Sequence, residues 1–335
     1  MNAHKSIMGL SSLEIRVASA VAPAKLILMG EHFVVYGCPA IAIPVPGLEL
    51  QATLRYEPES FQFSDSGICS SSSEILRDST NGSSGIRPRT HLQSCVHISA
   101  RHFGMDPERL HVEVCSSIPV GSGLGSSAAV SVAVARAVAG LVDGLDSAEL
   151  SASIRKISIE AETLAHGKPS GIDTEVCITQ RAVRFVKGSE PDVVRWGRSP
   201  RIGLVLMNTG VPSSTSHMVA RASKYIQRNS AGFERLRKEY IKDLEKTCAA
   251  LEEGDYKALG VLADRQHERL RILEVSSPEL EKLVITARAL GANGAKLSGA
   301  GGGGVAFAVC EGGEEERLGE KLRAEGIDVV KSTRI

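Results

Sequence analysis

The sequence lacks an excess of either charge, and this absence limits the partners that the chain can have. Lys and Arg together number 39 and so do Asp and Glu, which gives a formal net charge of zero. Proteins that bind nucleic acid usually carry a basic excess, so nucleic acid is not an expected partner. Aromatic residues make up only 4% of the chain, with one Trp, so aliphatic side chains and Ala must fill its core.

Cysteines are few and scattered. There are seven, none of them in a C-x-x-C pair: Cys38, Cys69, Cys95, Cys115, Cys177, Cys248 and Cys310. An odd number without regular spacing argues against a disulfide framework and against a zinc site. The pattern fits a reducing, cytoplasmic compartment.

Targeting and membrane segments are lacking too. Residues 1–16 have no long apolar core and no small-residue cleavage site, which argues against a secretory signal. The most apolar stretch, 128–142, is interrupted by Arg136 and is too short to cross a bilayer. We therefore expect a cytoplasmic protein with no membrane partner.

The sequence does contain an intermixed pattern of strands and helices. Short apolar runs broken by Pro and Gly between residues 13 and 54 predict strands joined by turns. The small, apolar stretch 128–142 predicts a buried helix, and one apolar stripe along 147–166 predicts an amphipathic helix. Further strands are expected at 111–115, 182–187, 202–208 and 305–309, and further helices around 233–251, from 278 onward and at 314–325. Because both signals occur in both halves, the fold class is α+β.

The length of 335 residues exceeds one average domain and favours two. The polar, Pro-containing segment 188–201 is the best candidate for a junction, and we place the N-terminal domain at residues 1–194 and the C-terminal domain at 195–335. The Ser-rich segment 64–91 has little apolar content and predicts a surface loop of unassigned role.

The strongest local signal is the segment 119–129, PVGSGLGSSAA. Its three alternating glycines allow positive φ and close approach of a ligand to the backbone. A buried helix follows at once, so helix amides and the positive end of the helix dipole meet there, which is the setting for a phosphate. A tight turn with a Ser cap is the alternative, but it needs only one glycine. The sequence thus predicts an ATP-binding N-terminal domain.

This loop is not a Walker A loop, because the Lys of G-x-x-x-x-G-K-[ST] is missing. A second glycine cluster, 298–304, formally matches G-x-G-x-x-G. A dinucleotide-binding fold requires a helix after such glycines, whereas 305–309 predicts a strand. A plain flexible loop is one interpretation of the cluster; closure over the ligand of the first loop is the other.

Four segments together resemble one family. Residues 22–37, APAKLILMGEHFVVYG, are similar to the first motif of the mevalonate kinases, and 166–173, HGKPSGID, to their catalytic segment. The two glycine segments resemble the second and third motifs of the wider superfamily of galacto-, homoserine, mevalonate and phosphomevalonate (GHMP) kinases. The motifs keep the family's order. Ala24 departs from the pattern, since the family commonly has Gly before the Lys.

The resemblance implies a two-domain GHMP kinase fold, with an N-terminal domain like the second domain of ribosomal protein S5 and a ferredoxin-like C-terminal α/β sandwich. It also implies an ATP-dependent kinase that phosphorylates the primary hydroxyl of mevalonate to 5-phosphomevalonate, in isoprenoid biosynthesis. The alternatives are a phosphomevalonate kinase, which Lys168 beside the catalytic segment keeps open, and a sensor that has lost catalysis. A homodimer is expected by analogy alone.

Site roles follow from the resemblance, residue by residue. Asp173 is expected to be the general base, with Lys25 close to it to offset charge on the phosphoryl group. The residues expected to hold the phosphates of ATP are Pro119, Gly121, Ser122, Gly123, Leu124, Gly125, Ser126, Ser127 and Ala128. Mg²⁺ prefers hard oxygen ligands, and the expected pair is Ser127 and Glu162. Periodicity alone does not separate Glu162 from Glu160; the family spacing selects Glu162.

The resemblance also assigns a substrate pocket. Glu31 and His32 are expected to line it, with His32 donating to mevalonate oxygens, although a structural His bonded to backbone is an alternative. Ser170 and Thr215 match polar positions close to the active site, where they orient Asp173 or substrate, or else cap helices. Gly301, in the third motif, is placed with the substrate-binding residues.

Overall fold

The computed structural model describes residues 15–57, 90–119, 121–167, 169–195 and 201–335. They form two compact units. The first unit takes its described residues from Met1–Ala22, Leu50–Ser116 and Val130–Pro169, and the second from Pro23–Glu49, Ser117–Ala129 and Ser170–Ile335. The units interleave along the chain, so they do not test the boundary expected between residues 194 and 195. Most of the Ser-rich segment, Lys168 and part of the expected junction lie outside the described residues.

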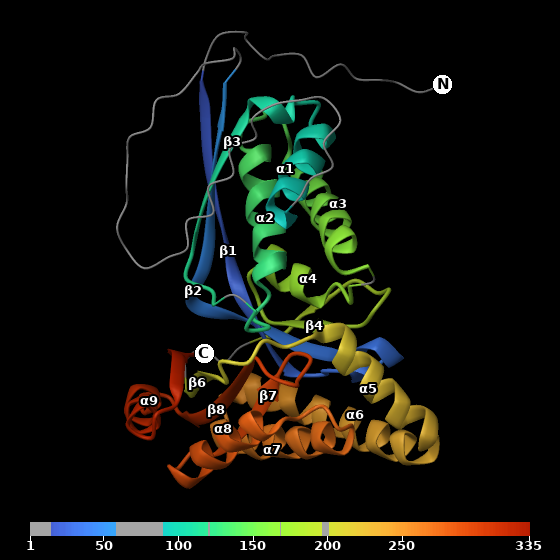
Figure 1. Ribbon diagram of the computed structural model, residues 1–335, viewed down its shortest axis with the longest axis vertical. Coiled ribbons are helices and arrows are strands. Elements are labelled where there is room, and N and C mark those ends of the chain that lie inside the picture. Colours follow the sequence, from blue (N-terminus) through green and yellow to red (C-terminus); the bar gives the residue numbers. More distant parts are fainter. Residues whose placement is uncertain (1–14, 58–89, 120, 168, 196–200) are drawn as a thin grey trace. The chain divides into compact units, whose positions relative to one another are not determined.

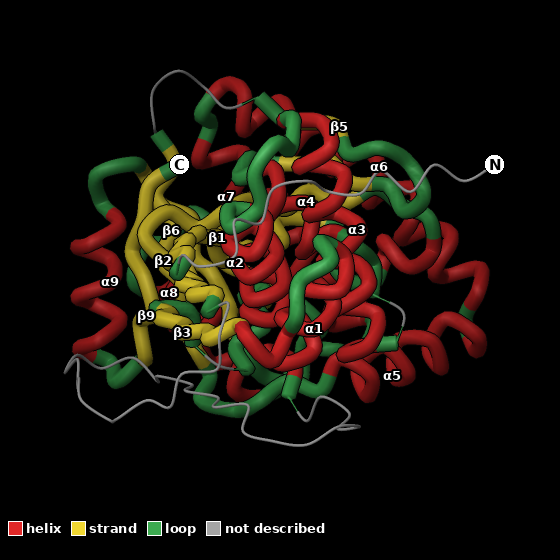
Figure 2. Tube along the Cα trace, turned by 90° about the horizontal axis from the view of Figure 1, so that it is seen from above, coloured by secondary structure: helices red, strands yellow, loops and turns green. Residues whose placement is uncertain are grey.

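The first unit sets three helices beside long strands (Figures 1 and 2). Its strands come from β1 (Arg16–Met29), β2 (Ala40–Tyr56) and β3 (Leu110–Ser116), and its helices are α1 (His91–His102), most of α2 (Ser126–Ala139) and α3 (Ser147–His166), with a short 3-10 turn at Pro107–Arg109. β2 and β3 are antiparallel, with Leu50 opposite Ser116 and Tyr56 opposite Leu110. α1 packs against α3.

Local chemistry explains these helices. Thr90 and Gln93 form a capping box at the start of α1, and the Asp146 carboxylate accepts the amides of Ala148 and Glu149 at the start of α3. α3 has the bounds expected from its apolar stripe. α2 is buried along its apolar length, as its composition predicts, and its Ala and Val side chains from 132 to 138 are almost fully enclosed.

The prediction of strands joined by turns between residues 13 and 54 is confirmed, and the strands are long. β1 is 14 residues long and β2 is 17, and β2 continues through Pro44 and Pro46. β2 pairs with β4 at residues 40–42 and with β3 at residues 50–56. The prolines lie between these two ladders, so neither β3 nor β4 requires their missing N–H groups.

The second unit contains β4 (Val183–Phe185), β5 (Asp192–Val193), α4 (Ile172–Thr179) and a 3-10 turn at Phe33–Tyr36. The sheet order is β1-β2-β4-β5, with β3 also pairing with β2, so β1 and β2 serve both units. An apolar cluster fixes α4 over this sheet; its members are Ile27, Val34, Ala40, Ala42, Ile172, Val176, Val183 and Phe185. The cluster sets the position of the residues at the start of α4.

A second sheet of the same unit has the order β7-β8-β6-β9, and every neighbouring pair is antiparallel. The strands are β6 (Ile202–Asn208), β7 (Gly294–Ser298), β8 (Val305–Glu311) and β9 (Asp328–Arg334), and the helices are α5 (Thr215–Arg228), α6 (Ser230–Glu253), α7 (Tyr256–Ile272), α8 (Pro278–Ala289) and α9 (Glu315–Ala324). Helices separate β6 from β7 and β8 from β9, so two split β-α-β units interlock. This is the expected ferredoxin-like arrangement.

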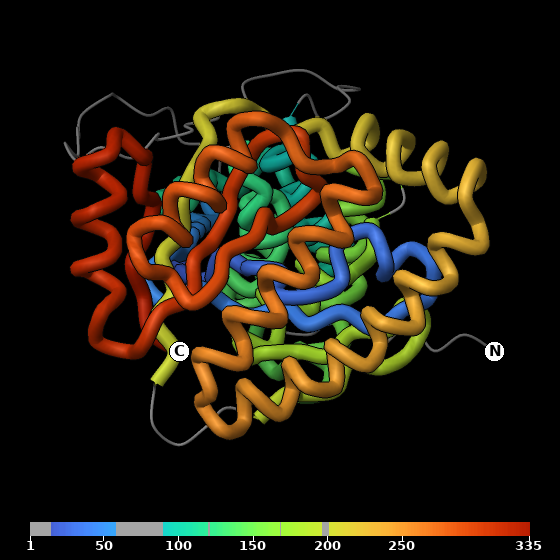
Figure 3. The backbone as a smooth tube through the Cα atoms, turned by 90° about the horizontal axis from the view of Figure 1, so that it is seen from below, coloured from blue at the N-terminus to red at the C-terminus, as the bar shows by residue number. Residues whose placement is uncertain are grey.

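The helices of this sheet form a second layer. α7 and α8 pack on β7 and β8, and α9 packs on β6 and β9. Figure 3 shows α6 and α7 side by side. Phe33 stacks on Tyr240 of α6 with ring centroids 4.4 Å apart, which anchors the turn after β1. Among the described residues, no helix has both the length and the apolar content needed to cross a membrane.

Candidate active site

The glycine loop keeps the conformation that its composition predicts. Gly121, Gly123 and Gly125 have φ of 70°, 80° and 77°, and α2 begins at the next residue, Ser126. Ser122 Oγ donates to the Pro119 carbonyl at 2.7 Å and tightens the turn. A helix N-terminus has amide groups without intrahelical acceptors and a partial positive charge. The loop therefore has the geometry of an anion seat, although Val120 lies outside the described residues.

Lys25, on β1, lies directly against this loop. Its backbone N–H donates to the Leu124 carbonyl at 2.9 Å. Its side chain runs past Gly125 so closely that a Cβ there would lie 2.7 Å from Lys25 Cγ. Glycine at this position thus allows the lysine stem to reach its partner.

That partner is Asp173. Lys25 Nζ lies 3.0 Å from Asp173 Oδ1, and the lysine side chain is 3% exposed while the aspartate side chain is 36% exposed. Asp173 is the second residue of α4, whose apolar face is held in the core. The expectation that Lys25 lies close to Asp173 is confirmed. A buried ammonium and a carboxylate that solvent can reach form one couple beside the anion seat.

A second ion pair lies behind the first. Lys296, on β7, is fully buried, and its ammonium donates to Glu31 Oε1 and, at 2.6 Å, to the Leu297 carbonyl. Burial lowers the pKa of Lys296, and the charge of Lys25 adds to this, whereas Glu31 opposes it. Lys296 has no role among the sequence-based expectations. A lysine inside an otherwise small and apolar strand, G-A-K-L-S, is the signal that could have drawn attention to it.

His32 has an unusual backbone, with φ of 63°, and is nearly enclosed. Its Nε2 lies 2.8 Å from the Ala300 carbonyl, which can only accept, so Nε2 carries the hydrogen. Burial lowers the pKa of His32, so the ring is neutral near pH 7. Nε2 is therefore not free to donate to substrate. It donates to the backbone instead, which agrees with the alternative of a structural histidine. Among the described residues, no hydrogen-bond partner reaches His32 Nδ1 or Glu31 Oε2.

The two glycine segments lie together in the second unit. A Cβ on Gly304 would lie 2.9 Å from the Ser122 carbonyl, and one on Gly299 would lie 3.7 Å from the Gly123 carbonyl. Ser298 Oγ contacts both the N–H and the carbonyl of Ile27 at 3.1 Å, which ties the second segment to β1. The interpretation of 298–304 as a partner of the first loop is thus supported over that of an isolated flexible loop.

The remaining predicted substrate residues differ in their surroundings. Gly301 lies within the second segment, and its carbonyl accepts from Ser213 Oγ at 2.6 Å. A Cβ on Gly301 would lie 2.1 Å from the Val275 carbonyl, so only glycine fits there. Thr215 is exposed at the start of α5, where Ser214 rather than Thr215 is the N-cap residue. Ser170 is partly buried just before Gly171, the N-cap of α4.

The two glutamates of α3 are now distinguished. Glu160 is at the surface and pairs with Arg101 at 2.6 Å. Glu162 is buried; its Oε1 accepts from Ser131 Oγ at 3.0 Å and lies 3.2 Å from His91 Nε2. Burial by itself raises the pKa of Glu162. The hydrogen bonds from His91 and Ser131, together with the charges of His91 and His166, outweigh this effect and lower the pKa. Glu162 lies in the first unit and Ser127 in the second, so their pairing stays a prediction.

Comparisons with known proteins agree with these features. The model of the GHMP kinases N-terminal domain matches residues 90–181, and that of the GHMP kinases C-terminal domain matches residues 248–328. Mevalonate kinase of Aeropyrum pernix is 32% identical over 319 residues, covering 90% of this chain and 91% of that protein. Mevalonate kinase of Pyrococcus horikoshii is 33% identical over 327 residues, with the same coverage.

Solved structures give the same result. The crystal structure of L. major mevalonate kinase in complex with R-mevalonate aligns with a TM-score of 0.76 and 25% identity, covering 96% of each chain. The alignment spans nearly the whole of both chains. The chain therefore belongs to the mevalonate kinase family of the GHMP kinases, and it has the two-domain α+β fold of that family.

Proposed function

We propose that this protein transfers the γ-phosphoryl group of ATP to the primary hydroxyl of mevalonate and produces 5-phosphomevalonate. The observation that carries the proposal is the Lys25–Asp173 pair, whose Nζ and Oδ1 atoms lie 3.0 Å apart. The backbone N–H of the same lysine donates to the glycine loop. Phosphoryl transfer requires mainly positioning and charge neutralisation, and this unit supplies a base, a cation and an anion seat. The R-mevalonate held by the L. major relative supports mevalonate as the substrate.

In this mechanism the glycine loop binds the phosphates of ATP. The amides after Gly121, Gly123 and Gly125 and the N-terminal end of α2 face the phosphate oxygens, which are the ligands that such backbone groups prefer. The neighbouring segment 298–304, tied to the loop through Ser122 and Gly304, limits water at the transfer site.

Asp173 and Lys25 do the chemistry on the substrate. Asp173 is exposed enough to meet a hydroxyl, and its carboxylate takes the hydroxyl proton as the oxygen attacks the γ-phosphorus. The bond from that phosphorus to the bridging oxygen breaks and ADP leaves. The buried Lys25 ammonium offsets the negative charge that grows on the attacking oxygen and on the transferred group.

Glu31 and His32 hold the substrate from the other side. Glu31 Oε2 and His32 Nδ1 are buried acceptors, and the hydroxyl of mevalonate that does not react can donate to one of them. Because His32 Nε2 is fixed on Ala300, the ring presents Nδ1 in one orientation only. This arrangement favours a ligand with hydroxyl groups over one that offers only acceptors.

The donor set also fits Mg²⁺. The lowered pKa of Glu162 keeps a carboxylate at neutral pH, and a carboxylate with a serine hydroxyl is the kind of hard oxygen pair that Mg²⁺ accepts. Glu162 would be one ligand of the ion, as the family spacing predicts. When bound, Mg²⁺ neutralises charge on the phosphates of ATP.

Two glutamates on one helix give a matched test of this metal assignment. In Glu162→Gln we expect kcat to fall at least about tenfold, a barrier increase of about 1.4 kcal/mol, because a neutral amide is a poor Mg²⁺ ligand. The Glu160→Gln variant loses only a surface pair with Arg101 and should keep kcat within about twofold. Initial rates across a Mg²⁺ titration provide the measurement. Equal effects of the two substitutions would contradict the assignment of Glu162.

A substrate panel tests the proposed reaction directly. Purified protein with Mg-ATP is given mevalonate, phosphomevalonate, homoserine or galactose, and ADP release is followed together with the phosphorylated product. We expect turnover with mevalonate and little with the other three. Turnover with phosphomevalonate alone would favour the sibling kinase, and binding of mevalonate without any ADP release would favour a sensor.

A further inference from the structure

β7 is an edge strand whose outer side is held by side chains instead of another strand. Among the described residues, β7 pairs only with β8, with Lys296 opposite Phe307. In such a ladder alternate residues direct their N–H and carbonyl groups outward, and here these residues are Ala295 and Leu297. An unpaired edge exposes N–H and carbonyl groups that can pair with another chain, unless other groups form hydrogen bonds with them.

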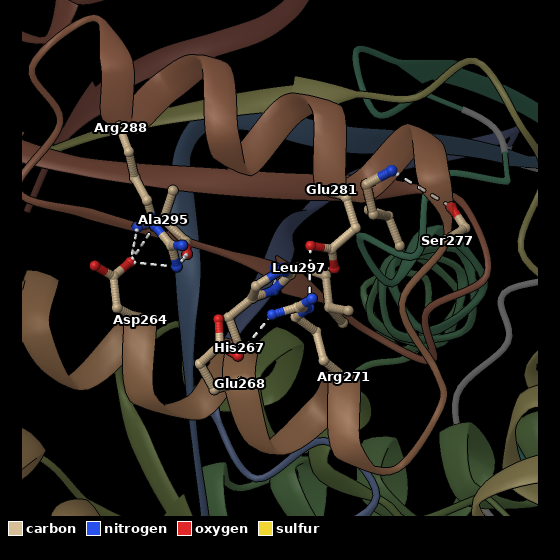
Figure 4. Close-up of polar contacts among 10 residues, drawn as sticks. Asp264, His267, Glu268, Arg271, Ser277, Glu281, Arg288, Ala295 and Leu297 are labelled. Atoms are coloured by element: carbon tan, nitrogen blue, oxygen red, sulfur yellow. Dashed lines mark hydrogen bonds and ion pairs between the residues drawn. The ribbon is translucent and has the colours of Figure 1, made fainter.

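All four outward groups of β7 have side-chain partners. The Ala295 N–H donates to Asp264 Oδ1 at 2.8 Å, and its carbonyl accepts from Arg288 Nη2 at 3.1 Å. The Leu297 N–H donates to His267 Nδ1 at 3.3 Å, and its carbonyl accepts from Lys296 Nζ at 2.6 Å. Three of these partners come from α7 and α8, as Figure 4 shows. Side chains of two helices thus fix the position of the strand.

His267 is fully buried. Its Nε2 lies 3.1 Å from Glu281 Oε1, which can only accept, so Nε2 carries the hydrogen and Nδ1 is left as the acceptor for Leu297. Glu281 is in turn held by Arg271 Nε at 3.2 Å (Figure 4). Burial lowers the pKa of His267 to about 4, so the ring keeps this neutral form at neutral pH.

The position of β7 decides where the second glycine segment lies. Lys296 reaches Glu31 on one side of the strand, and Ser298 at its end bonds Ile27 of β1. The chain then enters 298–304, whose Ala300 carbonyl holds His32 and whose glycines contact the phosphate loop. A shift of Leu297 would therefore move groups that contact both halves of the proposed site.

We propose that His267 is a positioning residue for phosphoryl transfer: through Leu297 its Nδ1 holds β7 and thereby keeps the segment 298–304 against the phosphate loop and His32. This inference rests on the kinase function proposed above. His267 itself touches neither the Lys25–Asp173 pair nor the loop in any contact of the described residues. Its effect on the reaction is transmitted by the strand.

Two substitutions at His267 separate its two hydrogen bonds. Asn places an acceptor oxygen where Nδ1 lies and can still receive the Leu297 N–H. Gln places its polar atoms where Nε2 lies, so it can still donate to Glu281 but cannot reach Leu297. Each variant is assayed for kcat and for KM of ATP and mevalonate, for Tm, and for hydrogen–deuterium exchange of the segment 293–304 without ligands.

We expect His267→Gln to lower kcat about tenfold or more and to speed amide exchange in 293–304, because a displacement on the order of 1 Å near reacting groups has large effects. We expect His267→Asn, with a similar Tm, to recover most of the kcat and the slow exchange. A purely structural role predicts instead that the two variants lose activity in proportion to their loss of Tm. That outcome, with wild-type exchange in the Gln variant, would overturn the proposal.

Two further variants keep the test decisive. Asp264→Ala removes the acceptor for the Ala295 N–H from a partly exposed position, so it should fold even if His267→Gln does not, and it should change exchange and kcat in the same direction. Thr247→Val removes a buried hydrogen bond within α6, away from β7, and should lower Tm while kcat stays within about twofold.

A wild-type enzyme without turnover on any substrate would refute the proposed kinase. An active wild type, with unchanged kcat in both His267→Gln and Asp264→Ala, would refute only the role of His267.

Discussion

Replacing Asp173 by Asn is expected to lower kcat by about 10²–10⁴-fold, the usual contribution of a positioned general base, while ATP still binds. Asn has nearly the same shape and can keep a contact with Lys25, but it cannot accept the proton of the attacking hydroxyl. The phosphate loop does not depend on this side chain, because its contacts are with Lys25 backbone and with 298–304. ADP release measures kcat, and calorimetry with ATP measures binding.

The matched control is Asp192→Asn. Asp192 also faces a cation, with Oδ2 3.7 Å from Arg184 Nη1, but it is largely exposed and far along the sheet from Lys25. Surface pairs of this kind contribute little, so activity and Tm should stay close to those of the wild type. If Asp173→Asn keeps turnover within about tenfold of wild type, a barrier difference of about 1.4 kcal/mol, Asp173 is not the base.

Adding one methyl group at Gly125 is expected to reduce kcat by about 10²-fold, because it displaces the lysine that faces Asp173. A Cβ at this position would lie 2.7 Å from Lys25 Cγ, closer than real contacts allow, and 3.1 Å from Lys25 Cε, which is tighter than most real contacts. The positive φ of 77° adds strain of about 1–2 kcal/mol in any residue other than glycine. Gly125→Ala should therefore lose activity by more than its loss of stability explains.

Gly144→Ala measures the strain alone. Gly144 has a similar φ of 80°, but nothing lies within 4 Å of an added Cβ, and it is outside the proposed site. Its free energy of unfolding should fall by about 1–2 kcal/mol with kcat unchanged. Thermal unfolding and steady-state kinetics on both variants give the comparison. Equal kcat values for the two variants would show that Lys25 does not need its present path.

The local elements of this protein were predictable because their causes lie within a few residues. Asp146 caps α3 and Ser277 with Pro278 starts α8, and the predicted starts of both helices are confirmed. The alternating glycines before Ser126 predicted a loop that faces a helix N-terminus, and the φ values agree. The closeness of Lys25 to Asp173 was expected from family motifs, since no periodicity relates residues so far apart.

Other features depended on contacts that local sequence does not encode. β2 continues through Pro44 and Pro46 because these lie between two ladders and cost the strand no hydrogen bond to β3 or β4. His32 was expected to donate to substrate, yet the Ala300 carbonyl, 268 residues further along the chain, takes its hydrogen. The choice of Glu162 over Glu160 came from family spacing, and only burial separates the two chemically.

The sequence by itself determined where α3 and α8 begin, that α2 is a buried helix, and which loop can receive a phosphate, because capping, periodicity and backbone freedom are short-range properties. Only the tertiary structure decided that Lys296 meets Glu31, 265 residues away, and that His267 holds the edge of β7. Such contacts depend on strand register, in which a slip of one residue turns every side chain to the other face. Neither the composition nor the local pattern of a segment encodes which distant segment will lie beside it.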